Sequence, residues 1–79
     1  DFPDIEITYS YNPINKELQV NSSDILTNIK IYNTIGQNVL STEINTFEHY
    51  MKLNFLSPSI YFVEVESFGK VKTFKLIVN

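Results

Sequence analysis

The 79-residue chain contains no cysteine, tryptophan, arginine or alanine, and only two glycines. Without cysteine it cannot form a disulfide or a cysteine-ligated zinc site, which are common stabilising devices in small domains. Lysine is its only strongly basic residue type, and six lysines face nine acidic residues, for a formal net charge of −3. Nucleic-acid-binding domains usually present a basic surface with arginine, so the composition argues against that class.

Long apolar runs are missing as well. No run approaches the about 20 residues that a membrane-spanning helix needs, and no basic segment followed by an apolar one marks a secretory signal peptide. The length allows a single domain. A domain of this size buries only about 60–65% of the surface of its unfolded chain, which leaves little room for an enclosed active site. Because the chain begins at Asp1 rather than methionine, we expect it to be a segment of a longer protein.

Residues that favour β-structure are abundant. The absence of alanine removes the best helix former, whereas the frequent isoleucine, valine, threonine, tyrosine and phenylalanine suit a pleated surface. Alternation of apolar and polar residues predicts short strands at 5–11, 18–20, 29–32, 39–44, 50–55, 61–66 and 71–78. Turns are expected between them, including the polar stretches 21–24 and 45–48. The pattern predicts an all-β fold, an immunoglobulin-like or fibronectin-type antiparallel β-sandwich of about seven strands.

The last predicted strand is out of phase with itself. Val71 and Thr73 lie on one face, whereas Phe74, Leu76 and Val78 lie on the other. Either a β-bulge near Thr73 or burial of both faces would explain this pattern, and the sequence favours neither.

Ahead of the sixth predicted strand, Leu56 and Pro58 precede Tyr61. This order resembles the tyrosine corner of immunoglobulin-like and fibronectin-type sandwiches, in which the tyrosine hydroxyl bonds back to nearby backbone. We therefore expect these three residues to have a structural role.

Side chains that could support chemistry are few and isolated. His49 is the only histidine, and alone it cannot complete a zinc site or a catalytic triad. Glu64 and Glu66 share one strand face but alternate with valines, so we expect them in solvent rather than as a catalytic pair. Gly36 and Gly69 are isolated from other glycines, unlike those of a phosphate-binding loop. We therefore expect no enzymatic activity, no metal and no cofactor.

Two features leave open how the chain meets its partners. Five tyrosines and six phenylalanines could supply exposed rings that stack on sugars, so an accessory β-sandwich module of a secreted enzyme, carbohydrate-binding or a spacer, is the alternative function. Lys70, Lys72 and Lys75 gather in the last predicted strand. On an edge strand, lysines oppose sheet-to-sheet aggregation, or they let a partner bind by charge and strand addition.

Several motifs occur in a characteristic order. Asn12-Pro13 follows the first predicted strand, residues 29–39 read Ile-Lys-Ile-Tyr-Asn-Thr-Ile-Gly-Gln-Asn-Val, and residues 56–63 read Leu-Ser-Pro-Ser-Ile-Tyr-Phe-Val. The closing tail contains Lys-Leu-Ile at 75–77. This order resembles the type A C-terminal sorting domain of the type IX secretion system of Bacteroidota. Three features differ from the family pattern. Tyr11 replaces the first proline of a Tyr-Pro-Asn-Pro turn, residues 14–16 lack the glycine that usually follows that turn, and Ser59 replaces a glycine.

The resemblance implies a non-catalytic address label. In that family the cargo enters the periplasm, the C-terminal domain is recognised by the translocon, and both cross the outer membrane to the cell surface or medium. The implied partners are the type IX translocon, an outer-membrane shuttle protein, a sortase-like signal peptidase that commonly removes the domain, and a cargo domain upstream in the same chain. Residues 1–4 are then the end of a linker from the cargo, and residues 5–79 are the sorting domain.

A receptor can read the exposed turns and edges of such a domain. We expect recognition contacts at Asn12, Pro13, Gly36, Gln37, Lys72, Lys75, Leu76 and Ile77. An exposed edge strand would also allow two copies of the chain to pair as a dimer.

Overall fold

A computed structural model describes residues 6–79, so the linker expected at 1–4 and the strand start expected at Ile5 lie outside the described residues. The strands are β1 (Ile7–Asn12), β2 (Glu17–Tyr32), β3 (Asn38–Lys52), β4 (Ser59–Ser67) and β5 (Lys70–Val78). All neighbouring strands are antiparallel. β2 pairs with β3 along one edge, with β1 and β4 along the other, and β5 pairs with β4.

Two of the strands are longer than the sequence predicted. β2 runs without a break through the polar stretch 21–24, and β3 runs through 45–48. Neither stretch contains proline or glycine, so nothing in the backbone ends the hydrogen-bonded ladder there. The predicted turns at these two places are wrong, and four predicted short strands are merged into two long ones.

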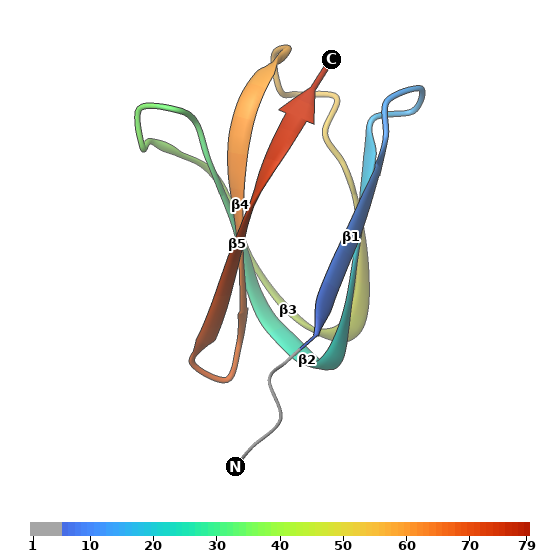
Figure 1. Cartoon of the computed structure of the whole chain (residues 1–79), viewed down its shortest axis with the longest axis vertical. Helices are drawn as coiled ribbons and strands as arrows, with labels where there is room; N and C mark the ends of the chain where they lie inside the picture. Colours follow the sequence, from blue (N-terminus) through green and yellow to red (C-terminus); the bar gives the residue numbers. More distant parts are fainter. Residues whose placement is uncertain (1–5) are drawn as a thin grey trace.

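At these polar stretches the long β2–β3 hairpin bends instead of ending. β2 advances from Asn21 to Leu26 while β3 advances only from Glu48 to Thr46, and a second register shift follows between Leu26 and Asn28. Extra residues on one strand of an antiparallel pair bend it and increase its twist. The hairpin therefore curls until its two halves face each other (Figure 1).

The resulting architecture is one curled sheet, a half-barrel of five antiparallel strands (Figure 1). The predicted all-β antiparallel class is correct, but residues 6–79 form no seven-strand immunoglobulin-like or fibronectin-type sandwich. Because β2 and β3 continue from one side of the core to the other, the strands on the two sides of the core belong to a single sheet. Where β1 and β5 approach each other, the rings of Tyr9 and Phe74 stack with centroids 3.8 Å apart.

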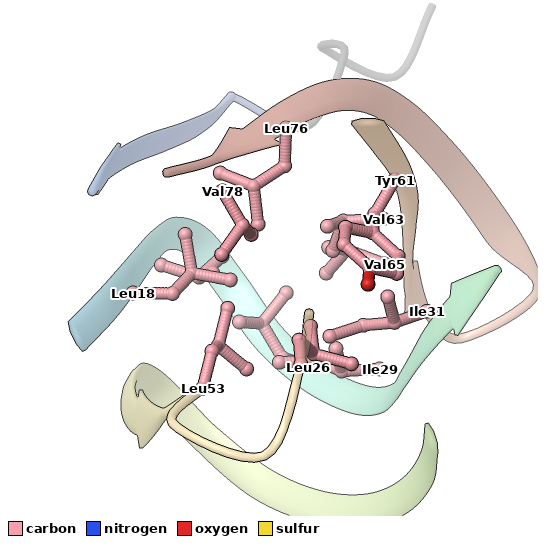
Figure 2. Packing of buried hydrophobic residues seen from close by; sticks show 12 residues of the cluster. Leu18, Leu26, Ile29, Ile31, Leu53, Tyr61, Val63, Val65, Leu76 and Val78 are labelled. Carbon is pink, nitrogen blue, oxygen red and sulfur yellow. The ribbon is translucent and has the colours of Figure 1, made fainter. Parts of the chain in front are cut away.

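The hydrophobic core lies inside the curl and takes side chains from both of its halves (Figure 2). Leu18 and Ile31 of β2 both point inward although one has an even number and the other an odd one. The register shifts at the bend explain this, because a shift of one residue exchanges the two faces of a strand. The other buried apolar residues are Val20, Leu26, Ile29, Leu53, Leu56, Tyr61, Val63, Val65, Leu76 and Val78.

β5 is regular along its whole length. Its register with β4 is unbroken from Val78, opposite Ser59, to Lys70, opposite Ser67. Val71 is half-exposed on the outer face of the strand. Both explanations drawn from the sequence, a bulge near Thr73 and burial on two faces, are therefore wrong, because β5 simply carries apolar residues on its solvent side.

The turn between β4 and β5 is occupied by Phe68 and Gly69, with φ of 47° and 85°. Positive φ at both central residues is the type I′ geometry, which favours Asn-Gly. A residue with a Cβ pays about 1–2 kcal/mol in this left-handed region. The Phe68 side chain is 67% exposed, so little packing offsets that cost.

We expect Phe68→Asn to raise the free energy of unfolding by about 1 kcal/mol, because asparagine tolerates the left-handed region. Urea unfolding followed by circular dichroism measures the change. Gly69→Ala is the control and should destabilise the chain, since it adds a Cβ at a φ of 85°. An unfolding midpoint of Phe68→Asn at or below that of the wild type would contradict the prediction.

Candidate functional site

The loop between β2 and β3 is organised by Asn33. Its Oδ1 accepts the N–H groups of Ile35 at 3.1 Å and Gln37 at 2.9 Å, and its Nδ2 donates to Oε1 of Gln37 at 3.0 Å. Backbone hydrogen bonds between Asn33 and Gln37 and between Gly36 and Asn33 close the loop. Gly36 has a φ of 86°, which favours glycine. Gly36 and Gln37 therefore belong to one internally braced, exposed turn, called the Asn33 turn below.

The turn between β1 and β2 contains Asn12 and Pro13 and uses a similar device. Asn12 Oδ1 accepts the N–H of Ile14 at 2.9 Å. The carbonyl oxygen of Lys16 accepts the N–H of Leu53 at 2.8 Å, which joins this turn to the loop 53–58 after β3. Both Asn12 and Pro13 are exposed.

The residues predicted to form a tyrosine corner lie where loop 53–58 enters β4. The Tyr61 hydroxyl donates a 2.7 Å hydrogen bond to the carbonyl oxygen of Ser57. Tyr61 and Leu56 are buried, whereas Pro58 is exposed. The bond runs back to upstream backbone, as in a tyrosine corner, and it ties the loop to the core.

The four candidate residues of the last strand differ in what they offer to a partner. Lys75 and Ile77 are exposed on the outer face of β5. Leu76 points into the core and is only 3% exposed. Lys72 is exposed but lies nearer to the β4–β5 turn. In the folded domain, the side chains of Lys75 and Ile77 are therefore accessible together, whereas that of Leu76 is not.

Lys75 and Ile77 are part of a larger outer surface. Ile60 of β4 lies opposite Ile77, and Phe62 of β4 lies between Lys75 of β5 and Tyr32 of β2. We call these five residues the outer patch. Because Tyr32 directly precedes the Asn33 turn, the patch reaches from β5 to Gly36 and Gln37.

Three residues of the outer patch, Tyr32, Ile60 and Phe62, were not among the contacts predicted from sequence, although Ile60 and Phe62 are more than a third exposed. For Phe62 the signal was present. It lies between Tyr61 and Val63, and because both of these point inward, strand alternation requires Phe62 to face outward.

Asn12 and Pro13 lie apart from this surface. Asn12 ends β1 and Pro13 follows it, and β1 pairs with the first half of β2, whereas the outer patch uses the second half of β2 with β4 and β5. Strand pairing thus puts Lys75 and Ile77 on the half of the curl that leads into the Asn33 turn, and the Asn12-Pro13 turn on the other half.

Two titratable residues of the sheet, Glu66 and His49, lie beside residues of the neighbouring strand β2. Oε1 of Glu66 accepts a 2.9 Å hydrogen bond from Nδ2 of Asn28. His49 is half-buried on β3, opposite Val20. Within residues 6–79, no three His, Cys, Asp or Glu side chains are grouped to hold a metal ion. The same residues contain no helix long and apolar enough to cross a bilayer.

One phenol has a perturbed proton affinity. Partial desolvation raises the pKa of Tyr50 above its ordinary value, and the nearby carboxylates of Glu48 and Glu17 raise that pKa further. Its oxygen accepts a hydrogen bond from Nε2 of Gln19 at 3.1 Å. A raised pKa keeps the phenol protonated, so less phenolate is present to act as a base or nucleophile, and these contacts do not activate Tyr50.

Comparison with known families gives one result. The model of a family described as "Secretion system C-terminal sorting domain" matches residues 11–79. The matched range contains both turns, the Tyr61–Ser57 hydrogen bond and the whole of β5. No match is found among curated proteins.

Proposed function

Because the chain belongs to the family of C-terminal sorting domains of the type IX secretion system, we propose that the outer patch is the surface through which the secretion machinery reads it. The chain is a non-catalytic secretion signal for cargo proteins. This family implies interaction with the secretion machinery, attachment to an upstream cargo, and export across the outer membrane to the cell surface or medium.

The accessibility of the outer patch is the observation that carries this proposal. Lys75 and Ile77 project from β5 beside Phe62, and in the described residues the far edge of β5 pairs with no other strand. A receptor strand added to that edge would gain backbone hydrogen bonds, while the neighbouring side chains supply specificity. Lys75 would favour an acidic group of the receptor at one defined position.

The other candidate residues would contribute to recognition in different ways. Gly36 and Gln37 border the outer patch, so the Asn33 turn is a second contact of the same receptor. Asn12, Pro13 and Lys72 lie elsewhere and stay predicted contacts. Leu76 supports recognition indirectly, because its burial in the core holds β5 in place.

We also propose how the domain meets its other partners. An outer-membrane shuttle protein carries the domain with its cargo, and a sortase-like peptidase cuts ahead of β1 at the cell surface. β1 begins at the end of the molecule opposite to the end of β5, so a receptor at the end of β5 leaves the cargo side free (Figure 1). Pairing of two chains through an unpaired edge of β1, β3 or β5 stays a prediction.

An export assay tests the outer patch. A periplasm-targeted reporter is fused ahead of the 79 residues and expressed in a host with a type IX system, with and without Lys75→Glu and Ile77→Ser. We expect surface and medium reporter to fall by about tenfold or more, because a reversed charge and a lost apolar contact together exceed the 1.4 kcal/mol that a tenfold change requires. The reporter should accumulate in the periplasm instead.

The matched control makes the same two changes near the other end of β5, as Lys70→Glu and Val71→Ser, because neither residue is a predicted contact. Both pairs alter one exposed lysine and one exposed apolar residue, so their unfolding midpoints should agree. Wild-type export of the Lys75/Ile77 variant, or equal loss in both variants, would contradict the proposed surface.

A further inference from the structure

Two turns expose an isoleucine in the same way. In each, an asparagine Oδ1 accepts the N–H of the residue two positions later, Ile14 in one turn and Ile35 in the other. The backbone is thereby held while the side chain projects outward, with Ile14 93% and Ile35 77% exposed. Asn and Asp are usual in such turns, but isoleucine at the tip has no role in the turn itself.

Loop 53–58 contributes a third projecting side chain. Phe55 is 59% exposed and lies inside a turn closed by the N–H of Leu56 and the carbonyl oxygen of Leu53. The hydrogen bond between Leu53 and Lys16 fixes this loop beside the turn that carries Ile14. The three loops lie at the end of the molecule where β5 ends, opposite the start of β1 (Figure 1). We call this the loop end.

Charge is unevenly distributed between the two ends of the molecule. Lys16 and Lys52 lie at the loop end with Lys75 nearby, and Glu17, opposite Lys52, is the carboxylate beside them. Most described acidic residues lie toward the bends of the long hairpin, where Lys70 and Lys72 offset them only in part. These acidic residues are Glu6, Asp24, Glu43, Glu48 and Glu66.

We propose that the loop end docks on an anionic phospholipid bilayer. Single apolar side chains that project from separate rigid turns enter the fluid boundary between headgroups and acyl chains without needing matching pockets. The lysines around them would meet anionic headgroups, which attract basic residues at a membrane surface. A protein receptor would need three pockets at matching positions, so three exposed side chains on separate turns favour lipid.

Bilayer docking does not require the outer patch, although the two surfaces meet at the Asn33 turn, where Gly36 and Gln37 border the patch and Ile35 belongs to the loop end. The outer patch lies on the face of β2, β4 and β5, whereas the loop end is made by turns. Docking of the loop end would hold the domain at the membrane with its cargo side away from the bilayer. Vesicle binding needs no translocon, so the two proposals can fail separately.

Co-sedimentation with vesicles tests the proposal on the 79-residue chain. The vesicles contain phosphatidylcholine alone or phosphatidylcholine mixed with phosphatidylglycerol. We expect binding to the mixed vesicles, weakened by added salt and by Lys16→Gln with Lys52→Gln. The triple variant Ile14→Ser, Ile35→Ser and Phe55→Ser should bind about tenfold more weakly or worse, because three apolar contacts are lost.

A matched triple variant removes exposed apolar side chains near the opposite end, as Phe47→Ser, Phe68→Asn and Val71→Ser, and should bind like the wild type. Thermal unfolding confirms that each variant is folded. No wild-type binding to mixed vesicles, or equal losses in the two triple variants, would overturn the proposal. If the wild type binds no vesicles and the loop-end variant still abolishes reporter export, the loop end contacts protein rather than lipid.

Discussion

Leu26→Ala will lower the free energy of unfolding by about 3 kcal/mol, within the about 2–5 kcal/mol measured for buried leucines. Leu26 is fully buried at the bend of β2, and Figure 2 shows its side chain within the cluster that fills the curl. Register shifts on both sides of Leu26 pin the backbone, so the cavity has little freedom to collapse. A chain of this length has a total stability of about 4–12 kcal/mol, so the loss is a large fraction of it.

Urea unfolding of the wild type and the variant measures the effect. Ile35→Ala is the matched control, because it also truncates an aliphatic side chain but at an exposed turn, and it should change stability by less than about 0.5 kcal/mol. If Leu26→Ala is no more destabilising than this control, the core does not meet at the bend as described.

The second large effect is expected at Ser67, where alanine should cost about 2 kcal/mol, since an unpaired buried polar group costs about 1–3 kcal/mol. Ser67 is fully buried, and its Oγ donates a 2.6 Å hydrogen bond to the carbonyl oxygen of Ile25. This bond ties the end of β4 to the bend of β2. Ser67→Ala leaves that carbonyl without its donor and loosens the bend.

Urea unfolding gives the cost, and amide hydrogen exchange shows where it acts. Exchange should accelerate around the β2 bend, because opening there becomes easier. Ser59→Ala, an exposed serine of the same strand, should change stability by less than about 0.5 kcal/mol. Equal effects at Ser59 and Ser67 would show that the buried bond contributes no net stability.

The strand pattern was predictable wherever local alternation agreed with the final register. Tyr61, Val63 and Val65 alternate with residues that face outward in β4, and all three are buried as the alternation requires. The hairpin turn at Phe68-Gly69 was also predictable, because Gly69 lies in the short interval between the alternating run 61–66 and the next predicted strand. In both cases the information lies within a few consecutive residues.

The polar stretches 21–24 and 45–48 could not be interpreted in this way. Polar residues accompany turns because loops are solvated, but they do not by themselves end a hydrogen-bonded ladder. Pairing with β1 and β3 keeps β2 extended beyond Asn21. Between the next paired positions β2 has more residues than β3, and this difference makes the hairpin bend there. The chain therefore forms a half-barrel rather than the predicted sandwich because of pairing between residues that are distant in sequence.

For the candidate surface, too, the sequence predicted some residues, whereas their orientation and neighbours required the structure. The motif residues around Gly36 and the Lys75–Ile77 tail were identifiable from the order of residues alone. Whether Leu76 or Ile77 faces a partner depends on which side of β5 packs on the core, and the structure places Leu76 inside. Phe62 lies between Lys75 and Tyr32 only because β5 pairs with β4 and β4 pairs with β2.

The order of residues along the chain was sufficient for the all-β character, the turns at Asn12-Pro13 and Gly36, and the family of secretion signals to which the chain belongs. These properties depend on short-range backbone preferences and on local motifs, which every copy of the sequence carries. The number of strands, the bend at Leu26 and the position of the outer patch came from the tertiary structure. Strand register is a cooperative choice between distant segments, because it is set by the core that they bury together.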